Sequence, residues 1–171
     1  MRRATGSIRV FTFKEGLMSA VAHDLRVQLR TFEITLDGTD VKGVFDLRSL
    51  LVEGPVENDV LFAERYDDGK RAEVAKAMHG QVLHTDKYPQ AVFTGSATPS
   101  ASRGDGYRVV GELELAGSRR PLDFEVRNEQ GSYRAEIELK PSSWGISQYK
   151  ALFGAIKLKD MIRIELALTE G

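Results

Sequence analysis

The feature that most constrains the fold of this chain is a regular alternation of apolar and polar residues in its second half. Every second side chain is apolar and most of its neighbours are charged in four runs, at residues 107–115, 121–128, 132–140 and 162–168. A period of two places one face of a β-strand against a core and the other in water. Short breaks that carry glycine or asparagine separate the middle runs, as antiparallel hairpins require. The second half is therefore predicted to be an antiparallel meander.

The first half repeats this pattern less cleanly. Apolar residues alternate in 25–29 and 32–36, and the segment 41–54 is predicted to place Phe45, Leu47 and Leu51 on one side. These runs bring the expected total to about nine strands. No motif repeats with a period of 20 to 50 residues, so solenoids and propellers are excluded.

One segment is predicted to be helical, within residues 68–84. Asp67 or Asp68 is suited to cap its start, and Val74, Met78 and Val82 recur every fourth residue to form an apolar stripe. Pro89 prevents the helix from continuing and disfavours the helical conformation for the residue before it. The "KYP" turn is thus expected to end the helix, and the next strand to bring Phe93 inward.

Strands with one apolar face must close or stack to hide their edges. A single meander favours a barrel, because sandwiches need Greek-key crossings between two sheets. The predicted fold is all-β, an antiparallel closed barrel of about eight strands with one substantial helix. A barrel of this size either holds one small ligand or is filled by its own side chains.

Composition narrows the function. The 171 residues predict a single domain spanning 1–171, and the net charge of −1 gives no basic surface for nucleic acid. Cysteine is absent, so no disulfide, thiol nucleophile or thiolate metal site is expected. The N-terminal segment lacks the apolar run of a signal peptide, and no run of about 18 apolar residues suggests a membrane span. These features predict a soluble, cytoplasmic protein.

Four stretches taken in order resemble the YceI-like family. They are "AHDL", "DKYPQAVFTG", "YRVVGELELAGSRRPLDFEV" and "SSWGISQYKALFGAIKLKDMIRIELAL", and the resemblance runs from about residue 6 to the end. The resemblance implies a lipocalin-like barrel, and the family includes polyisoprenoid-binding proteins. Two features differ from the family pattern. Many relatives carry an export signal, whereas the N-terminal segment here does not have the pattern of one. The segment at residues 57–86 is longer and more helical than the stretch "RDxHLRSxDFF" that relatives have at this place, and its role is left open.

Three residues stand out as candidate ligand contacts, each with a simpler structural alternative. His23 is in phase with Leu25 and is expected to face inward, either hydrogen-bonded to backbone or anchoring a ligand headgroup. Trp144, the only tryptophan, is expected either to plug one end of the barrel or to form an aromatic wall of a pocket. Phe153 is expected to line the mouth or to cap the core.

Catalytic and metal sites lack the residues that they need. Adjacent strand residues point to opposite faces, so His23 and Asp24 do not form a pair, and His79 and His84 are not aligned on a helix as zinc ligands are. The serines at 142 and 143 have no nucleophile-elbow motif around them. We therefore expect no enzyme activity, no metal and no cofactor.

The function predicted is the binding or sequestration of a long-chain amphiphile, such as an isoprenoid quinone, a polyprenyl or a fatty-acyl lipid. The small inward residues Gly43, Gly111 and Ala135 are expected to leave space for its tail. The alternative is a barrel filled by side chains that acts as a stress-related interaction protein. The expected partner is a hydrophobic small molecule, and no nucleic acid is expected. A homodimer is compatible with this prediction. The residues expected to contact the ligand are His23, Leu25, Val27, Phe45, Leu47, Phe93, Leu113, Leu115, Phe124, Ile137, Trp144, Phe153, Ile156 and Leu158.

Overall fold

Strands dominate the computed structural model, which describes residues 1–15, 23–102 and 104–171. The described strands form one twelve-stranded sheet in which every pairing is antiparallel. They are β1 (Arg2–Glu15), β2 (Asp24–Leu29), β3 (Phe32–Asp37), β4 (Asp40–Asp46), β5 (Leu50–Glu57), β6 (Val60–Leu61), β7 (Gln90–Pro99), β8 (Tyr107–Leu115), β9 (Ser118–Glu129), β10 (Ser132–Leu139), β11 (Lys150–Ala151) and β12 (Ile156–Glu170).

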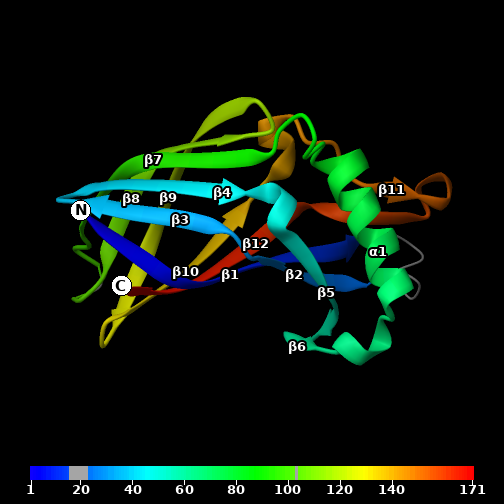
Figure 1. Cartoon of the computed structure of the whole chain (residues 1–171), viewed down its shortest axis with the longest axis horizontal. Helices are drawn as coiled ribbons and strands as arrows, with labels where there is room; N and C mark the ends of the chain where they lie inside the picture. The colour runs from blue at the N-terminus through cyan, green and yellow to red at the C-terminus, as the bar shows by residue number, and fades with distance from the viewer. Residues whose placement is uncertain (16–22, 103) are drawn as a thin grey trace.

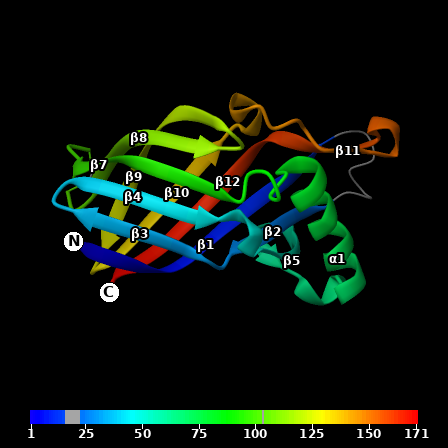
Figure 2. The same ribbon diagram turned by 45° about the horizontal axis from the view of Figure 1, so that its top comes forward.

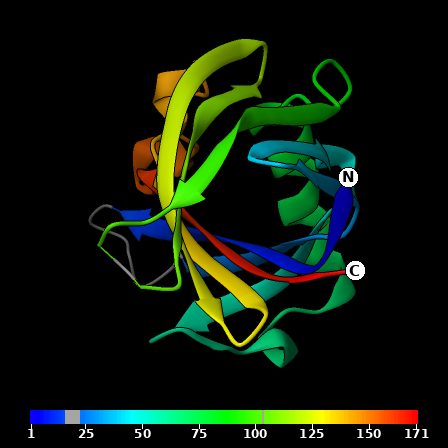
Figure 3. The ribbon, with the colours of Figure 1, turned by 90° about the vertical axis from the view of Figure 1, so that its left-hand side faces the viewer.

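Pairing between the first and last long strands closes the sheet into a barrel. The β1–β12 register runs from Ala4↔Glu170 to Glu15↔Lys157. Around the ring the strands follow the order β1, β12, β10, β9, β8, β7, β4 and β3, and Figure 3 shows them encircling the interior. On the side of β1 where β3 pairs, β2 pairs further along the strand and continues into β5 and β6. The predicted closed antiparallel barrel of about eight strands with one helix is confirmed.

The alternation seen in the sequence sets which side chains are inside. On β8, Val109, Leu113 and Leu115 are buried, whereas Val110 is 47% exposed on the outer face. The buried side chains form two clusters that share partly buried neighbours, Phe45 and Ile164 among them. The first cluster contains Leu47, Ala91, Phe93, Val109, Leu113, Leu115, Leu139, Trp144 and Ile146, and the second contains Ile8, Leu29, Ile34 and Leu168.

Leu51 does not share the inner side with Phe45 and Leu47, so that expectation was wrong. A 3-10 turn, η1 (Leu47–Ser49), separates β4 from β5, and the Asp46 side chain accepts a hydrogen bond from Arg48 N at its start. The turn breaks the strand period, and β5 restarts at Leu50, which packs against both clusters. Leu51 then points outward and is 44% exposed.

The predicted helix is present as α1 (Asp68–Ala77), followed by a π-helical turn, η3 (Met78–Val82). Asp67 caps it, because its side chain accepts from Lys70 N at 2.7 Å. The predicted stripe is half-buried: Val74, Met78 and Val82 are each of intermediate exposure and Val82 packs against the first core cluster, whereas no residue of α1 is fully buried. The helix lies at one end of the barrel (Figures 1 and 2). Within the described part of the chain, no helix is long and apolar enough to cross a membrane.

The "KYP" turn joins the helical segment to β7 through two contacts. The carbonyl of Pro89 accepts a hydrogen bond from Leu47 N at 2.9 Å. The ring of Tyr88 lies on Gly117 in the β8–β9 hairpin, where an added Cβ would come within 2.8 Å of Tyr88 Cε1. Phe93, the first large apolar residue of β7, is buried as predicted.

Candidate functional site

The hydrogen-bond ladder is interrupted along the seam between β9 and β10. These strands pair only from Ser132↔Glu129 to Arg134↔Arg127. Beyond that point β9 continues on β8 through residues 118–126, and β10 continues on β12 through residues 135–139. Two long stretches of strand therefore face each other without a hydrogen-bond ladder between them.

The seam contains a hollow of about 440 Å³, which we call the β9–β10 window. A neighbouring hollow of about 160 Å³ on the outer face shares Arg127, Ala135 and Glu136 with it. The window is lined by Asp123, Phe124, Glu125 and Arg127 from β9 and by Ala135, Glu136, Ile137 and Glu138 from β10.

Both ends of the window are closed by defined contacts. At the end near the chain termini, the β9–β10 ladder persists and Tyr107 and Tyr133 pack with ring centroids 6.1 Å apart. At the other end, a 3-10 turn, η4 (Pro141–Trp144), follows β10. Arg120 Nε of β9 donates to the Ser143 carbonyl of this turn at 2.9 Å. The window is thus a bounded hollow in the side of the barrel.

The lining residues that point inward are apolar. Ala135 and Ile137 are buried, and the half-buried Phe124 packs against the first core cluster. The Phe124 ring lies 5.8 Å from the ring of Phe93, centroid to centroid. Phe124 thereby links the window to the core.

The outward side chains at the window are mainly acidic. Asp123 pairs with Arg108 on the neighbouring strand, and the hydrogen bond from that guanidinium lowers the pKa of the Asp123 carboxyl. Oε2 of Glu125 is buried and has no hydrogen-bond partner among the described residues. Glu136 and Glu138 are exposed on the opposite strand. An apolar floor beneath a carboxylate-rich rim suits an amphiphilic molecule better than a polar one.

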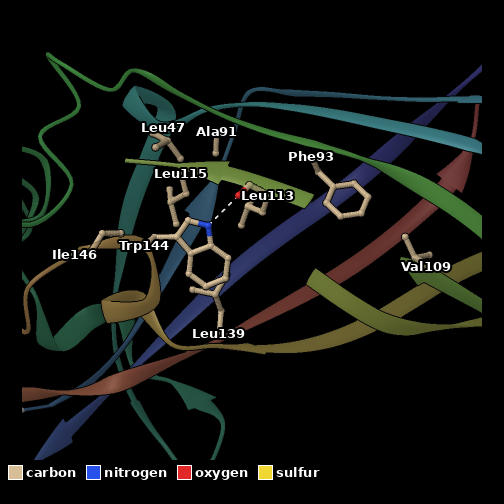
Figure 4. Close-up of a cluster of buried hydrophobic side chains, with 9 residues drawn as sticks. All are labelled: Leu47, Ala91, Phe93, Val109, Leu113, Leu115, Leu139, Trp144 and Ile146. Atoms are coloured by element: carbon tan, nitrogen blue, oxygen red, sulfur yellow. Dashed lines mark hydrogen bonds between the residues drawn. The ribbon is translucent and has the colours of Figure 1, made fainter. Parts of the chain in front are cut away.

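Trp144 closes the first cluster at the η4 end. Its indole is 5% exposed, and Nε1 donates to the Leu113 carbonyl at 2.9 Å. Figure 4 shows the indole between Leu115 and Leu139, with the bond to Leu113 as a dashed line. Asp160 of β12 holds the turn in place, because its carboxylate accepts from Ser142 N at 2.9 Å and from the Ser142 hydroxyl. The indole donor is therefore satisfied by the backbone, which leaves its face for packing.

The other predicted contact residues fall into three groups. Six are half-buried and seven are buried, Trp144 included. Phe153 is fully exposed at 112%, so of its two expected places, the barrel mouth or a cap on the core, it does not take the second. His23 packs edge-on against Tyr66, with 6.1 Å between ring centroids, and burial raises the pKa of the Tyr66 hydroxyl. The half-buried residues are His23, Leu25, Phe45, Phe124, Ile156 and Leu158, and the other buried ones are Val27, Leu47, Phe93, Leu113, Leu115 and Ile137.

The inward glycines do not leave empty space, contrary to expectation. A Cβ on Gly43 would lie 2.5 Å from Cζ of Phe45, and a Cβ on Gly111 would lie 2.7 Å from Cζ of Phe93. Gly95, which pairs with Gly111 across the β7–β8 ladder, is covered by the same Phe93 ring. The glycines make room for aromatic rings of the chain itself.

The remaining histidines serve local structure. His79 contacts the Thr85 hydroxyl at 3.1 Å through Nδ1 and the Leu50 carbonyl at 3.3 Å through Nε2. His84 has a positive φ of 49° in the turn that follows η3. No group of three or more histidine, aspartate or glutamate side chains with metal-binding geometry occurs in the described ranges.

Sequence reasoning identified Phe124 and Ile137 but missed the window between them. Asp123, Glu125, Glu136 and Glu138 read simply as the wet faces of two strands. The alternating pattern is the same whether the ladder between two strands is complete or broken, so the sequence carried no signal for the opening.

Several known proteins resemble the chain. A UPF0312 protein of Yersinia pestis (strain Pestoides F) is 34% identical over 100 residues, which cover 54% of this chain and 44% of that protein. The match therefore spans less than half the length of these curated relatives. Among solved structures, Burkholderia cenocepacia BcnA gives a TM-score of 0.64 at 14% identity, covering 95% of this chain and 94% of that chain.

A second solved structure is a polyisoprenoid binding domain from Saccharophagus degradans, with a TM-score of 0.61 at 11% identity. It covers 96% of this chain and 92% of that chain. Both structures show the same fold. The model of the YceI-like domain matches residues 6–169, and the chain belongs to the YceI-like family.

Proposed function

We propose that the protein binds a long-chain amphiphile, such as an isoprenoid quinone, a polyprenyl or a fatty-acyl lipid, and that the tail enters the barrel through the β9–β10 window. The observation that carries the proposal is the apolar floor of this opening, where Phe124 leads to Phe93 in the core. The family membership and the solved polyisoprenoid binding domain of the same fold support it.

Burial of the apolar tail is sufficient to supply the free energy of such binding. Each methylene transferred from water to an apolar interior contributes roughly 0.8 kcal/mol. The interior is filled by two side-chain clusters, so a tail must displace rings that already pack there. Phe124 is half-buried at the window and is the first ring that an entering tail meets. Binding is expected to begin with a rotation of this side chain.

The rim favours one class of headgroup. Four carboxylates, those of Asp123, Glu125, Glu136 and Glu138, line the window with one cation, Arg127. Like charges repel, so an anionic headgroup placed there is disfavoured. An uncharged headgroup that donates hydrogen bonds, or a cationic one, is the better match.

A second candidate function is that of a filled barrel acting through its surface. The observation that favours it is the coverage of Gly43, Gly95 and Gly111 by the rings of Phe45 and Phe93. Native mass spectrometry of protein purified from cells without added lipid separates the two. A co-purifying lipid supports the amphiphile proposal, and a bare mass combined with no uptake of a fluorescent prenyl or fatty-acyl probe supports the filled barrel.

Cross-linking the window tests the route of entry. The absence of native cysteine makes a double variant, Glu125→Cys with Glu136→Cys, uniquely addressable. These positions become cross-strand neighbours if the register Arg127↔Arg134 continues along the seam. Joining them with a short bis-thiol linker is expected to slow both uptake and release of the probe.

The matched control is Thr94→Cys with Glu112→Cys, an exposed pair across the intact β7–β8 ladder. Linking this pair leaves the window open, so probe kinetics are expected to stay as in the unlinked protein. Equal probe kinetics in the two linked variants would mean that the ligand enters elsewhere.

A further inference from the structure

The connection between β11 and β12 presents two adjacent apolar side chains to solvent. Leu152 is 59% exposed and Phe153 is 112% exposed. The other large exposed apolar residues, Met1, Leu51, Val60 and Val110, stand singly in the sequence. Single exposed apolar residues are common on proteins, whereas a contiguous apolar patch marks an interaction site.

The backbone holds these two side chains outward in an unfavourable conformation. Leu152, Phe153 and Gly154 form a 3-10 turn, η5 (Leu152–Gly154), with φ of 49°, 56° and 86°. Positive φ is rare for bulky residues, and such strain persists only where the surrounding structure imposes it. The β11–β12 pairs Lys150↔Lys157 and Ala151↔Ile156 flank this turn.

Three lysines lie on the two strands that lead to and from the apolar tip. Between Tyr149 and Lys159 the sequence contains Lys150, Lys157 and Lys159 and no acidic residue. Glu15 lies 3.7 Å from Lys157 Nζ. The next acid along the chain, Asp160, is engaged by Ser142. The tip therefore combines exposed apolar groups with an excess of positive charge.

The tip projects from the end of the molecule that carries α1, away from both chain termini (Figures 1 and 2). Because it protrudes, a flat surface meets it without a clash from the barrel wall. Apolar side chains inserted at the headgroup boundary with lysines beside them are the features of interfacial membrane binding.

We propose that the apolar tip, Leu152 and Phe153, inserts into the surface of an anionic lipid bilayer while Lys150, Lys157 and Lys159 contact the headgroups. This surface is separate from the β9–β10 window and the proposal does not depend on ligand binding. A second copy of the chain fits the tip less well, because two side chains bury far less than the roughly 1,200 Å² of a stable interface and the lysines of two copies repel.

Cosedimentation with vesicles tests the proposal on the full chain. The protein is expected to bind vesicles of phosphatidylcholine and phosphatidylglycerol and to bind poorly to phosphatidylcholine alone. Phe153→Ser is expected to weaken partitioning by about tenfold or more, because a large buried apolar side chain is lost. Lys159→Gln is expected to weaken it by about fivefold, the effect of one lysine near an anionic surface.

The matched control is Val110→Ser, which removes an exposed apolar side chain from the barrel wall. It is expected to bind vesicles as the unmodified protein does. Equal binding by Phe153→Ser and Val110→Ser, or no preference for anionic vesicles, overturns the proposal. So does a concentration-dependent dimer in sedimentation velocity that Phe153→Ser abolishes without any vesicle binding by the unmodified protein.

A labelled cysteine locates the contact. Phe153→Cys and Val110→Cys each carry a single thiol for an environment-sensitive fluorophore, because the chain has no other cysteine. A blue shift with anionic vesicles at position 153 and none at 110 supports insertion of the tip. A shift at 110 alone contradicts it. Retained probe uptake by Phe153→Ser shows that the tip and the window act separately.

Discussion

At the scale of single residues, the interior is shaped by pairs of a glycine and an aromatic ring. Phe93 covers both Gly95 and Gly111, and Phe45 covers Gly43. The rings can occupy these places on their own strands, and on β8 at Gly111, only because no Cβ stands in their way. Phe93 also contacts Phe124 at the window. The same ring thus fixes the packing of the β7–β8 ladder and the inner end of the candidate entry route.

Gly111→Ala is expected to destabilise the fold by at least the roughly 1–3 kcal/mol typical of overpacking. The added Cβ would lie 2.3 Å from the Thr94 carbonyl oxygen and 2.7 Å from Gly95 Cα. Both are backbone atoms and do not yield as a flexible side chain does. Urea unfolding followed by circular dichroism gives the change in free energy.

Gly80→Ala is the control for this measurement. Gly80 lies in η3, and a Cβ there meets no atom within 4 Å. Its replacement is expected to be neutral or slightly stabilising, because alanine restricts the unfolded chain. A Gly111→Ala variant as stable as Gly80→Ala would show that the β7–β8 ladder accommodates a side chain at position 111.

At the scale of elements, α1 is held to the barrel by polar contacts in place of a buried apolar face. Arg71 donates through Nη2 to the Ala63 carbonyl at 2.6 Å and through Nε to the Glu53 carbonyl at 3.3 Å. Ala63 begins the 3-10 turn η2 (Ala63–Arg65), and Glu53 lies in β5. One guanidinium therefore ties three elements together.

Arg71→Ala is expected to loosen the helix, at a cost of roughly 1.5–3 kcal/mol for hydrogen bonds to a charged group. Hydrogen exchange should rise across residues 68–82 while the barrel strands stay protected. Lys70→Ala is the control, since its contact with Glu73 at 3.4 Å is an exposed pair of little value. Equal exchange in the two variants would mean that other contacts hold the helix.

At the scale of the whole molecule, hydrogen-bond ladders join most pairs of neighbouring strands in the barrel. Polar contacts of carboxylates stabilise its turns and its outer face. Asp46 caps η1 beside Arg48, Asp123 pairs with Arg108 across β8 and β9, and Asp160 holds η4 against β12. In each case a hydrogen bond to the carboxylate, from Arg48, Arg108 or Ser142, lowers its pKa below 3.8.

This pattern predicts loss of stability in acid. A carboxyl whose pKa is lower in the folded state binds protons more readily when unfolded, so stability rises with pH above the folded pKa. The contribution is complete above the unfolded value near 3.8 and disappears as pH falls through the folded values. Asp160→Asn is expected to melt earlier than the unmodified protein at neutral pH, and the gap between their melting temperatures is expected to narrow toward pH 3.

Asp86→Asn, at an exposed position, is the control and is expected to leave the pH dependence unchanged. A constant gap between the unmodified protein and Asp160→Asn from neutral pH to pH 3 would contradict a stabilising role for the Asp160 carboxylate.

The sequence by itself determined most of the strands, most of the side chains that face inward and the helix between β6 and β7, but it did not indicate β1. Alternation at Val109, Leu113 and Leu115 is a local property, and so is the capping of α1 by Asp67. The periodicity of a local sequence carries no information on how distant segments pair or pack against each other. Only the tertiary structure decided that the ladder stops after Arg127↔Arg134 and that Phe93 fills the space over Gly111. Those features arise from the way that strands far apart in sequence meet, so the window was decided by packing and not by pattern.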